Sequence, residues 1–173
     1  MPDMRKTRTD HEIFQAFQNL LERKSFSEIT MIEIAREAQV HRNTVYKHFV
    51  DKYDLLRKFV SRELSHHAEL MTIFATQPFK AIAGLYQFGL SDLIKRQSAD
   101  SEFNLIVQES AVRLLYLRNE NDEILWNLGA ISSIFLWNDL HHHKLDLVAD
   151  YETLDKIYQT KQFPQPNKTL NPD

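Results

Sequence analysis

The stretch "ITMIEIAREAQVHRNTVYKHFVDKYDLL", from Ile29 to Leu56, contains the signals that decide the fold. Thr30 is followed three residues later by Glu33, the spacing of a capping box, which predicts that a helix begins at this threonine. Gln39 interrupts that helix, and Asp51 marks the start of a longer helix further along. The stretch therefore predicts two short helices joined by a tight turn, with a third helix close behind.

Small and apolar residues recur in this stretch at the spacing that a helix-turn-helix unit needs. Alanines allow the two short helices to cross closely, and valines fill the angle between them. The residues with this expected role are Ile34, Ala35, Ala38, Val40 and Val45. A supporting first helix is expected to start at Thr9, which forms a second capping-box pattern with Glu12. The N-terminal part of the chain thus predicts a three-helix unit.

The segment "VHRNTVYKHF", Val40 to Phe49, raises the question of what its polar groups bind, because a metal, a proton or a polyanion would each suit some of them. With its apolar residues facing inward, this helix would direct three polar side chains outward: Arg42, Asn43 and Lys47. An arginine can bind guanine bidentately, an asparagine can bind adenine in the same way, and a lysine can reach bases or phosphates. Binding to DNA is the interpretation that uses the hydrogen-bonding groups of all three side chains.

The composition limits the class of protein. The chain has 173 residues, 43% hydrophobic and 26% charged, with 3 glycines, 5 prolines and no cysteine. Few glycines and prolines favour helix, and the lack of cysteine excludes disulfides, thiolate nucleophiles and cysteine-zinc sites. The N-terminus and the lack of long apolar runs predict neither a signal peptide nor a membrane span, so a cytoplasmic location is expected. The net charge is −3, yet residues 1–58 are net basic, which is compatible with a polyanion bound at one end.

The rest of the chain predicts longer helices. The helix that starts at Asp51 is expected to continue as far as Phe74, and Pro78 then breaks the chain. Further helical segments follow, and a final short helix is expected around Tyr151 to Thr160. The prolines and the polarity of the last residues predict a frayed tail.

The sequence gives little support for catalysis or metal binding. No Ser-His-Asp set or glycine-rich phosphate loop is recognisable, so we expect no enzyme activity. Histidines at His66-His67 and in "DLHHHK", Asp139 to Lys144, raise the possibility of a metal site, since Asp139 has helical spacing to His142 or His143. Without ligands on a second helix, such a cluster is a weak metal signal. We therefore expect neither a metal nor another cofactor.

The stretch from Ile29 to Leu56 resembles the DNA-binding signature of the TetR/AcrR family of transcriptional regulators. The matching parts are the threonine that opens the helix, "IA" at 34–35, "A-x-V" at 38–40, "TVY-x-HF" at 44–49 and "DK-x-DLL" at 51–56. Two positions depart, because the family commonly has Gly where Gln39 stands and often Ser where His41 stands. The resemblance implies an all-α fold, with a three-helix helix-turn-helix DNA-binding domain at residues 1–56. A larger helical ligand-binding and dimerisation domain would follow at 57–162, with a flexible tail at 163–173.

The resemblance also implies roles for individual residues. Contacts with the DNA phosphates are expected from Thr30, Thr44, Tyr46, His48 and Lys52. For Tyr46 and His48, a half-buried packing role remains an alternative. In this family, apolar residues of the C-terminal domain line an inducer pocket. The candidates here, each of which taken singly fits the core better, are Phe74, Tyr86, Phe103, Tyr116 and Trp126.

A dimer interface is expected on the late helix beside Gly129, where small residues permit two helices to approach closely. The expected contact residues are Leu128, Ile131, Phe135, Leu154, Ile157 and Tyr158. The resemblance implies a regulator, most simply a repressor that binds a pseudo-palindromic operator as a homodimer and is released by a small-molecule effector. The alternative is a protein-interaction module whose C-terminal domain binds a partner protein instead.

Overall fold

The structure of the protein, a computed structural model, describes residues 4–87, 90–119, 122–142 and 144–164. All regular elements of these residues are helical, which confirms the predicted all-α fold. They are α1 (Met4–Leu21), η1 (Phe26–Glu28), α2 (Met31–Glu37), α3 (Arg42–His48), α4 (Lys52–His66), α5 (Ala68–Ile73), α6 (Pro78–Gln87), α7 (Leu90–Arg96), α8 (Ser101–Asn119), α9 (Glu123–Leu140) and α10 (Tyr151–Thr160). No helix among the described residues is long and apolar enough to cross a membrane. Most of the predicted tail, residues 165–173, lies outside the described residues.

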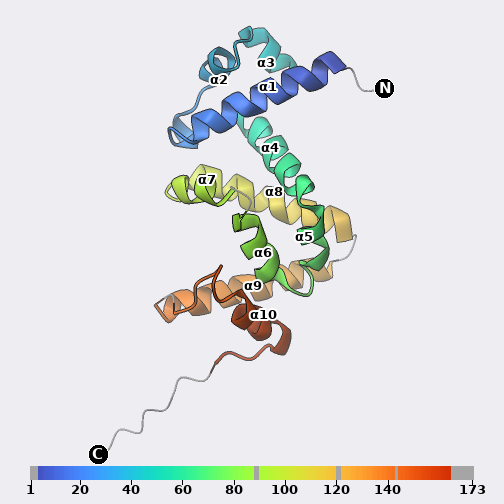
Figure 1. Ribbon diagram of the computed structural model, residues 1–173, viewed down its shortest axis with the longest axis vertical. Coiled ribbons are helices and arrows are strands. Elements are labelled where there is room, and N and C mark those ends of the chain that lie inside the picture. Colours follow the sequence, from blue (N-terminus) through green and yellow to red (C-terminus); the bar gives the residue numbers. More distant parts are fainter. Residues whose placement is uncertain (1–3, 88–89, 120–121, 143, 165–173) are drawn as a thin grey trace, which may run out of the picture.

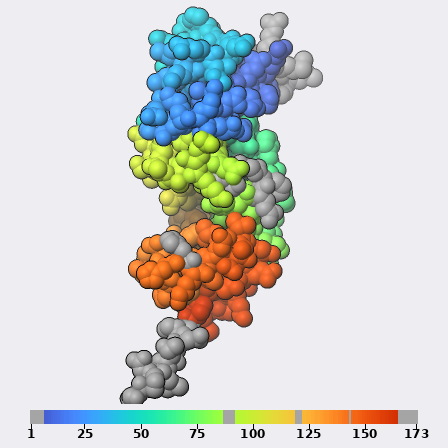
Figure 2. Space-filling view, turned by 60° about the vertical axis from the view of Figure 1, so that its left-hand side comes forward, coloured from blue at the N-terminus to red at the C-terminus, as the bar shows by residue number. Residues whose placement is uncertain are grey.

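The helices form an elongated molecule with two parts (Figure 1). The elements α1, η1, α2 and α3, which we call the head, occupy one end, and α5 to α10, which we call the body, form the rest. Helix α4 runs from the head into the body, where it packs against α8. The space-filling view shows the same order, with α9 and α10 at the end opposite the head (Figure 2). The predicted domain boundary after Leu56 falls inside α4, which is continuous.

Two of the predicted start signals hold. The Thr30 hydroxyl accepts a hydrogen bond from the Glu33 backbone N–H at 3.3 Å, and the Glu33 carboxylate accepts one from the Thr30 N–H at 2.9 Å, which completes the capping box. The Asp51 carboxylate accepts a hydrogen bond from the Asp54 N–H at 2.7 Å and caps α4. These local contacts satisfy N–H groups that a helix start leaves without an intrahelical partner.

Two helix limits differ from the prediction. Helix α1 begins at Met4, so Thr9 lies inside the helix, and Glu12 accepts a hydrogen bond from the Arg8 guanidinium at 2.9 Å instead of capping. The residues before Thr9 are good helix formers, which is why a capping-box pattern did not start the helix there. The helix predicted to run from Asp51 to Phe74 is also interrupted, because His67 leaves the helical conformation with φ −113° and ψ 44°.

The turn between α2 and α3 is closed by the hydrogen bonds of a Schellman motif. The Val40 N–H donates to the Ala35 carbonyl at 3.0 Å, and the Gln39 N–H donates to the Arg36 carbonyl at 3.2 Å. This motif requires a left-handed residue just after the helix, a position that glycine usually fills. Gln39 occupies this position with φ 54°. The turn expected from the sequence therefore forms, although a residue with a side chain disfavours the left-handed conformation.

Aromatic rings hold the core of the head together and tie α4 to it. Phe14 lies 5.3 Å from Phe49 between ring centroids, and Phe17 lies 5.9 Å from Phe59 and 6.2 Å from Phe26. All five rings are buried. Since Phe59 belongs to α4, the first half of α4 is part of the head's own core, and edge-to-face packing of this kind adds to the burial energy.

A buried glutamine joins the body to the head. Gln97, which follows directly after α7, is 1% exposed, and its side-chain amide donates to the carbonyls of Leu21 at 2.6 Å and Lys24 at 2.8 Å. Its side-chain oxygen accepts a hydrogen bond from the Phe26 N–H at 2.9 Å. Three backbone groups at the end of α1 and the start of η1 therefore find their partners in one side chain of the body.

Two charged groups complete the support of η1. The Asp100 carboxylate accepts hydrogen bonds from the Ser27 N–H at 2.7 Å and the Phe103 N–H at 3.0 Å. Burial raises the pKa of Asp100, but these backbone hydrogen bonds outweigh it and leave the pKa below its ordinary value. From the other side, the Lys52 ammonium of α4 donates to the carbonyls of Phe26 and Ser27 at 3.1 and 2.8 Å. We call Gln97, Asp100 and Lys52 together the η1 clamp.

The far end of the body is held by a carboxylate at the start of α6. This helix begins at Pro78, where the sequence predicted a break. Asp155 of α10 accepts hydrogen bonds from the N–H groups of Phe79 at 2.8 Å and Lys80 at 3.1 Å. Burial raises the pKa of Asp155, while the two N–H donors act in the opposite direction. The Phe79 ring packs 5.5 Å from Phe135, which brings α6, α9 and α10 into one core.

Replacing Gln97 by leucine tests the clamp. Gln97→Leu keeps the side chain's size but leaves three buried backbone groups without partners, so we expect a loss of about 2 kcal/mol in the free energy of unfolding. The melting temperature should fall by about 4–8 °C for a chain of this size. Ser98→Ala, at the exposed neighbouring position, should melt like the unchanged protein. Equal melting of both variants would contradict a structural role for the glutamine.

A second pair of variants tests the left-handed turn. Gln39 is exposed, so substitutions there change the backbone preference and few contacts. Gln39→Gly should raise the free energy of unfolding by about 0.5–1 kcal/mol, because the relief of left-handed strain outweighs the greater freedom of the unfolded chain. Gln39→Val should lower it, because a branched side chain is disfavoured at positive φ. Thermal unfolding of the two variants side by side measures the order, and a more stable valine variant would refute this account.

Candidate nucleic-acid interface

Helix α3 lies at the end of the molecule that the head forms (Figure 1), and one polar face of it is exposed to solvent. The exposed residues of this helix are Arg42, Asn43, Tyr46 and Lys47. They lie on one side because positions one, two, five and six of a helix fall within a single face. Val45, on the opposite side, is fully buried, and Phe49 just after the helix is buried with it. The predicted inward and outward directions are both confirmed.

The three predicted base-contacting side chains have their polar ends available. Among the residues that the structure describes, no hydrogen bond or ion pair occupies the side chains of Arg42, Asn43 or Lys47. The Arg42 guanidinium lies 5.8 Å from the centre of the Tyr46 ring, a cation–π contact that orients the arginine along the exposed face. This face therefore carries hydrogen-bond donors without internal partners, as direct reading of base edges requires.

The start of α3 is capped by His41, one of the two positions where the sequence departs from the family pattern. The Nδ1 atom of His41 accepts a hydrogen bond from the Asn43 N–H at 3.2 Å. A histidine thus takes the place of the usual hydroxyl cap, and its exposed ring stands beside Arg42 at the edge of the polar face.

Nearby carboxylates have partners within the head and the start of α4. Ion pairs join Glu37 to Arg23 and Asp54 to Lys58, and the Asp10 carboxylate is hydrogen-bonded to the His48 ring. The hydrogen bond from Arg23 lowers the pKa of Glu37, and hydrogen bonds from Lys24 and Thr30 lower the pKa of Glu33 to about 2. Because α3 contains no acidic residue and these neighbours are paired, the exposed face keeps its positive charge, which suits the phosphates of DNA.

The five predicted phosphate contacts divide into two groups. Tyr46 and Thr30 are exposed and Thr44 is half-buried beside the polar face. The Thr30 hydroxyl donates a hydrogen bond to the Glu33 carboxylate at 2.8 Å, so its part in the capping box and its expected phosphate contact involve the same atom. The outward group on α3 itself is thus Thr44 and Tyr46.

His48 and Lys52 are used inside the protein. The His48 ring is bonded to the Asp10 carboxylate of α1. The Lys52 ammonium belongs to the η1 clamp and lies 4.7 Å from the centre of the Phe26 ring. In the structure these side chains connect elements of the fold, and their expected phosphate contacts stay predictions. No local signal predicted this for Lys52, because its partners lie about 25 residues away in the chain.

The five residues predicted to line an effector pocket do not come together. Phe74 and Phe103 are buried, and the Phe103 ring packs 6.2 Å from Phe26 between centroids. Tyr86 is half-buried, Tyr116 is exposed and donates a hydrogen bond to Asp122 at 3.1 Å, and Trp126 is 82% exposed. An enclosed site cannot be made from residues that point to both core and solvent. The prediction of one pocket from these five residues is wrong.

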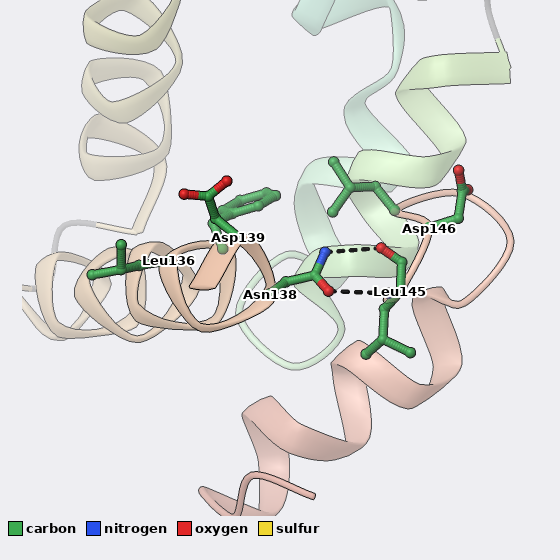
Figure 3. Close-up of a pocket in the computed structure, with 7 residues that line it drawn as sticks. Leu136, Asn138, Asp139, Leu145 and Asp146 are labelled. Atoms are coloured by element: carbon green, nitrogen blue, oxygen red, sulfur yellow. Dashed lines mark hydrogen bonds between the residues drawn. The ribbon is translucent and has the colours of Figure 1, made fainter. Parts of the chain in front are cut away.

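A pocket of about 520 Å³ lies instead where α9 meets the segment before α10 (Figure 3). Its lining is apolar apart from Asn138, Asp139 and Asp146. The Asn138 side chain exchanges two hydrogen bonds with the backbone of Leu145, at 2.8 and 3.0 Å. One carboxylate oxygen of Asp146 accepts from the N–H groups of Val148 and Ala149. These hydrogen bonds fix the conformation of the segment before α10. The Asn138 and Asp146 side chains that line the pocket therefore already have partners within the chain.

Three of the residues predicted for a dimer interface are buried within one protomer. Ile131, Leu154 and Ile157 are at most 5% exposed. The other three predicted residues pack against the core of the same chain: Leu128, Phe135 and Tyr158. Ile131, Leu154 and Ile157 therefore have little surface to offer a second copy, whereas the other three are half-buried. The opposite side of α9 is more exposed, and the dimer interface stays a prediction.

Comparison with known proteins agrees with the geometry of the head. Residues 13–59 match the model of the family described as bacterial regulatory proteins, tetR family. Over 64 residues, the chain is 36% identical to a protein of Haemophilus influenzae described as an uncharacterized HTH-type transcriptional regulator. This match covers 36% of the chain and 34% of the relative, so the chain spans about a third of the length of the curated relative it matches.

The family match begins in α1 and ends at Phe59 of α4. It therefore contains the capping box, the left-handed turn, the exposed polar face of α3 and the aromatic core that supports them. Sequence, geometry and comparison agree on these residues. In residues 13–59 the chain is similar to the tetR family of bacterial regulatory proteins, and in the structure these residues form a helix-turn-helix unit with its supporting helices.

Proposed function

We propose that this protein is a cytoplasmic transcriptional repressor that binds a pseudo-palindromic operator as a homodimer and releases it when an effector binds to the body. The observation that carries the proposal is the exposed face of α3, where Arg42, Asn43 and Lys47 have no internal partners among the described residues. These three side chains make no hydrogen bond or ion pair that would stabilise the described part of the head. It has the donors that reading of a major groove requires.

The residues of α3 take separate parts in this proposal. Arg42 and Asn43, at the N-terminal end of the helix, contact base edges, and Lys47 reaches a base or a phosphate one turn later. Thr44 and Tyr46 contact the phosphates and fix the register of the helix, with Thr30 adding a contact from α2. His48 and Lys52 act indirectly, by holding α3 and η1 to the rest of the head.

An exposed stripe on α9 supports the dimer. Its members recur at alternating spacings of three and four residues and so lie along one line of the helix: Trp126, Gly129, Ser133, Leu136 and Leu140. The three large side chains are 82%, 59% and 67% exposed in chain order. A carbon added to Gly129 would meet no described atom within 4 Å, so the middle of this α9 stripe lies open to another helix. Two copies joined there would bury the large side chains of both.

The effector acts through the connection between body and head. Two heads must keep a separation near one turn of the DNA, or a multiple of it, to occupy both half-sites. An effector that binds more tightly to a different separation lowers the affinity for DNA by that difference in binding free energy. The η1 clamp and α4 are the contacts through which the body holds the head, so they are the path for this coupling.

Substitution of the outward residues tests the base contacts. We expect Arg42→Ala to weaken binding to an operator selected by the unchanged protein from random duplexes by about 1–3 kcal/mol, or about 5- to 150-fold. Lys47→Ala should weaken binding less and lower the slope of log affinity against log salt by about 1 if it contacts a phosphate. Fluorescence anisotropy at several salt concentrations measures both.

The matched control for these variants removes an equal charge at the other end of the molecule. Lys156 is exposed on α10, and Lys156→Ala should leave operator affinity unchanged. If Arg42→Ala also binds the operator like the unchanged protein, the assignment of this arginine to base contacts is refuted. If the unchanged protein selects no operator, the proposed function fails.

The α9 stripe gives a separate prediction about assembly. We expect Leu136→Glu to raise the dissociation constant of the dimer by at least about tenfold, because the interface would bury an unpaired charge. Analytical ultracentrifugation over a concentration series measures the constant. Ile32→Glu, at an exposed apolar residue of α2 in the head, should sediment as the unchanged dimer. An undiminished dimer in Leu136→Glu would show that another surface joins the copies.

A further inference from the structure

A second candidate site lies between α4 and α8, close to the joint between head and body. A groove of about 210 Å³ runs between these helices. It is lined by Arg57 and Ser61 from α4 and by Glu109, Ser110, Arg113 and Leu117 from α8, among others. We call it the α4–α8 groove. Its volume is below that of sites for drug-sized molecules, which indicates a small ligand.

A buried hydroxyl in this groove has no partner. Ser110 is 6% exposed, and its Oγ is the buried side-chain polar atom that finds no hydrogen bond among the described residues. A serine within a helix commonly bonds to the carbonyl one turn earlier, as Ser65 does with Ser61 at 2.6 Å in α4. A buried hydroxyl without a partner opposes folding, and each such group calls for an explanation. Ser110 lines the groove, so a rotation of its side chain would turn the hydroxyl, which is closed to solvent in this structure, toward a ligand that supplies the missing partner.

Two arginines that line the same groove, Arg57 and Arg113, have weak ionic partners or none among the described residues. The Arg57 guanidinium is 4.0 Å from the Glu109 carboxylate, which is the longest separation that counts as an ion pair. Arg113 has no hydrogen bond or ion pair within the described part of the chain. Lys58 also borders the groove but is bonded to Asp54 at 2.8 Å. Of these three cations, two are offset by a carboxylate, and one positive charge remains.

We propose that the α4–α8 groove binds a small organic carboxylate, and that this ligand is the effector of the proposed regulator. A carboxylate matches the planar fork of a guanidinium and accepts a hydrogen bond from a hydroxyl at the same time. One uncompensated charge suits a monoanion. The apolar wall of Leu114 and Leu117 suits the hydrocarbon part of such a molecule.

The position of the groove gives the ligand a path to the head. Its two walls belong to the two helices that hold η1, since α4 carries Lys52 and Asp100 precedes the first turn of α8. A carboxylate held by Arg57 on one wall and by Arg113 and Ser110 on the other would fix the angle between α4 and α8. This step rests on the proposed function, because only a DNA-binding head makes that angle a regulatory quantity.

The binding test uses the full-length protein with sodium benzoate and sodium hexanoate as probes and with benzamide, hexanamide and inorganic phosphate as comparison solutes. Saturable amide shifts at Arg57, Ser110 and Arg113 in NMR titrations are expected with the carboxylates and not with the amides. Arg113→Ala should weaken carboxylate binding by about tenfold. Arg118→Ala, at an exposed arginine of α8 outside the groove, should bind like the unchanged protein.

Ser110→Ala separates ligand binding from folding. It should weaken binding, yet melt at the same or a higher temperature without ligand, because it removes a buried hydroxyl that has no partner. Equal responses to carboxylate and amide, or unchanged binding in Arg113→Ala, would overturn the site. A response to phosphate in place of the carboxylates would overturn the ligand class.

The effector role of the carboxylate is tested by measuring operator affinity with and without it. Operator affinity measured by anisotropy should change when the carboxylate saturates the groove, and Arg113→Ala should remove that change. Carboxylate binding without any change in operator affinity would overturn the effector role. A protein that binds carboxylate but selects no operator would show that the proposed function has failed while the site stands.

Discussion

Among the contacts that join the head to the body beside the continuous helix α4, the buried side chain of Gln97 makes three hydrogen bonds. Its amide reaches the end of α1 and the start of η1, two segments that α2 and α3 follow directly in the chain. A glutamine is suited to this position because it offers donors and an acceptor without a charge to desolvate. The flanking clamp residues are charged, and each is surrounded by backbone groups of the opposite polarity. The recognition surface is therefore positioned by polar contacts within an apolar surrounding.

The head could be predicted from the sequence because its signals act over short distances. A capping box spans three residues and a left-handed turn is fixed by its own hydrogen bonds, so Thr30 and Gln39 kept their expected roles. Contacts between residues far apart in the chain leave no comparable local pattern in the sequence. Lys52 has the same sequence context whether it faces a phosphate or the carbonyls of η1, and only the fold decides. The predicted start of the first helix was wrong because the capping-box pattern at Thr9 lies inside a longer helical segment that begins at Met4.

The two sides of α9 show why the body was harder to predict. Leu128, Ile131 and Phe135 line its inner side, while Trp126 and Leu136 lie on its outer side, so the helix is apolar all round. Such a helix has no polar face to indicate which side meets the core. The dimer contact predicted from the sequence used the inner side of α9, whereas the dimer contact that we propose lies on the outer side. The α4–α8 groove was equally invisible, because Arg57 and Ser110 are far apart in the chain and meet only when α4 packs against α8.

The continuity of α4 has a mechanical consequence. Its 15 residues make a rod of about 22 Å, with one end inside the aromatic core of the head and the other against α8. A tilt of about 5° at the α8 end would move the opposite end by about 2 Å over that length. In a symmetric dimer the displacement occurs twice, in opposite directions. A movement of this size exceeds the tolerance of hydrogen bonds to base edges. In the proposed dimer, a rigid lever would therefore turn an ångström-scale change in the body into the loss of both half-sites together.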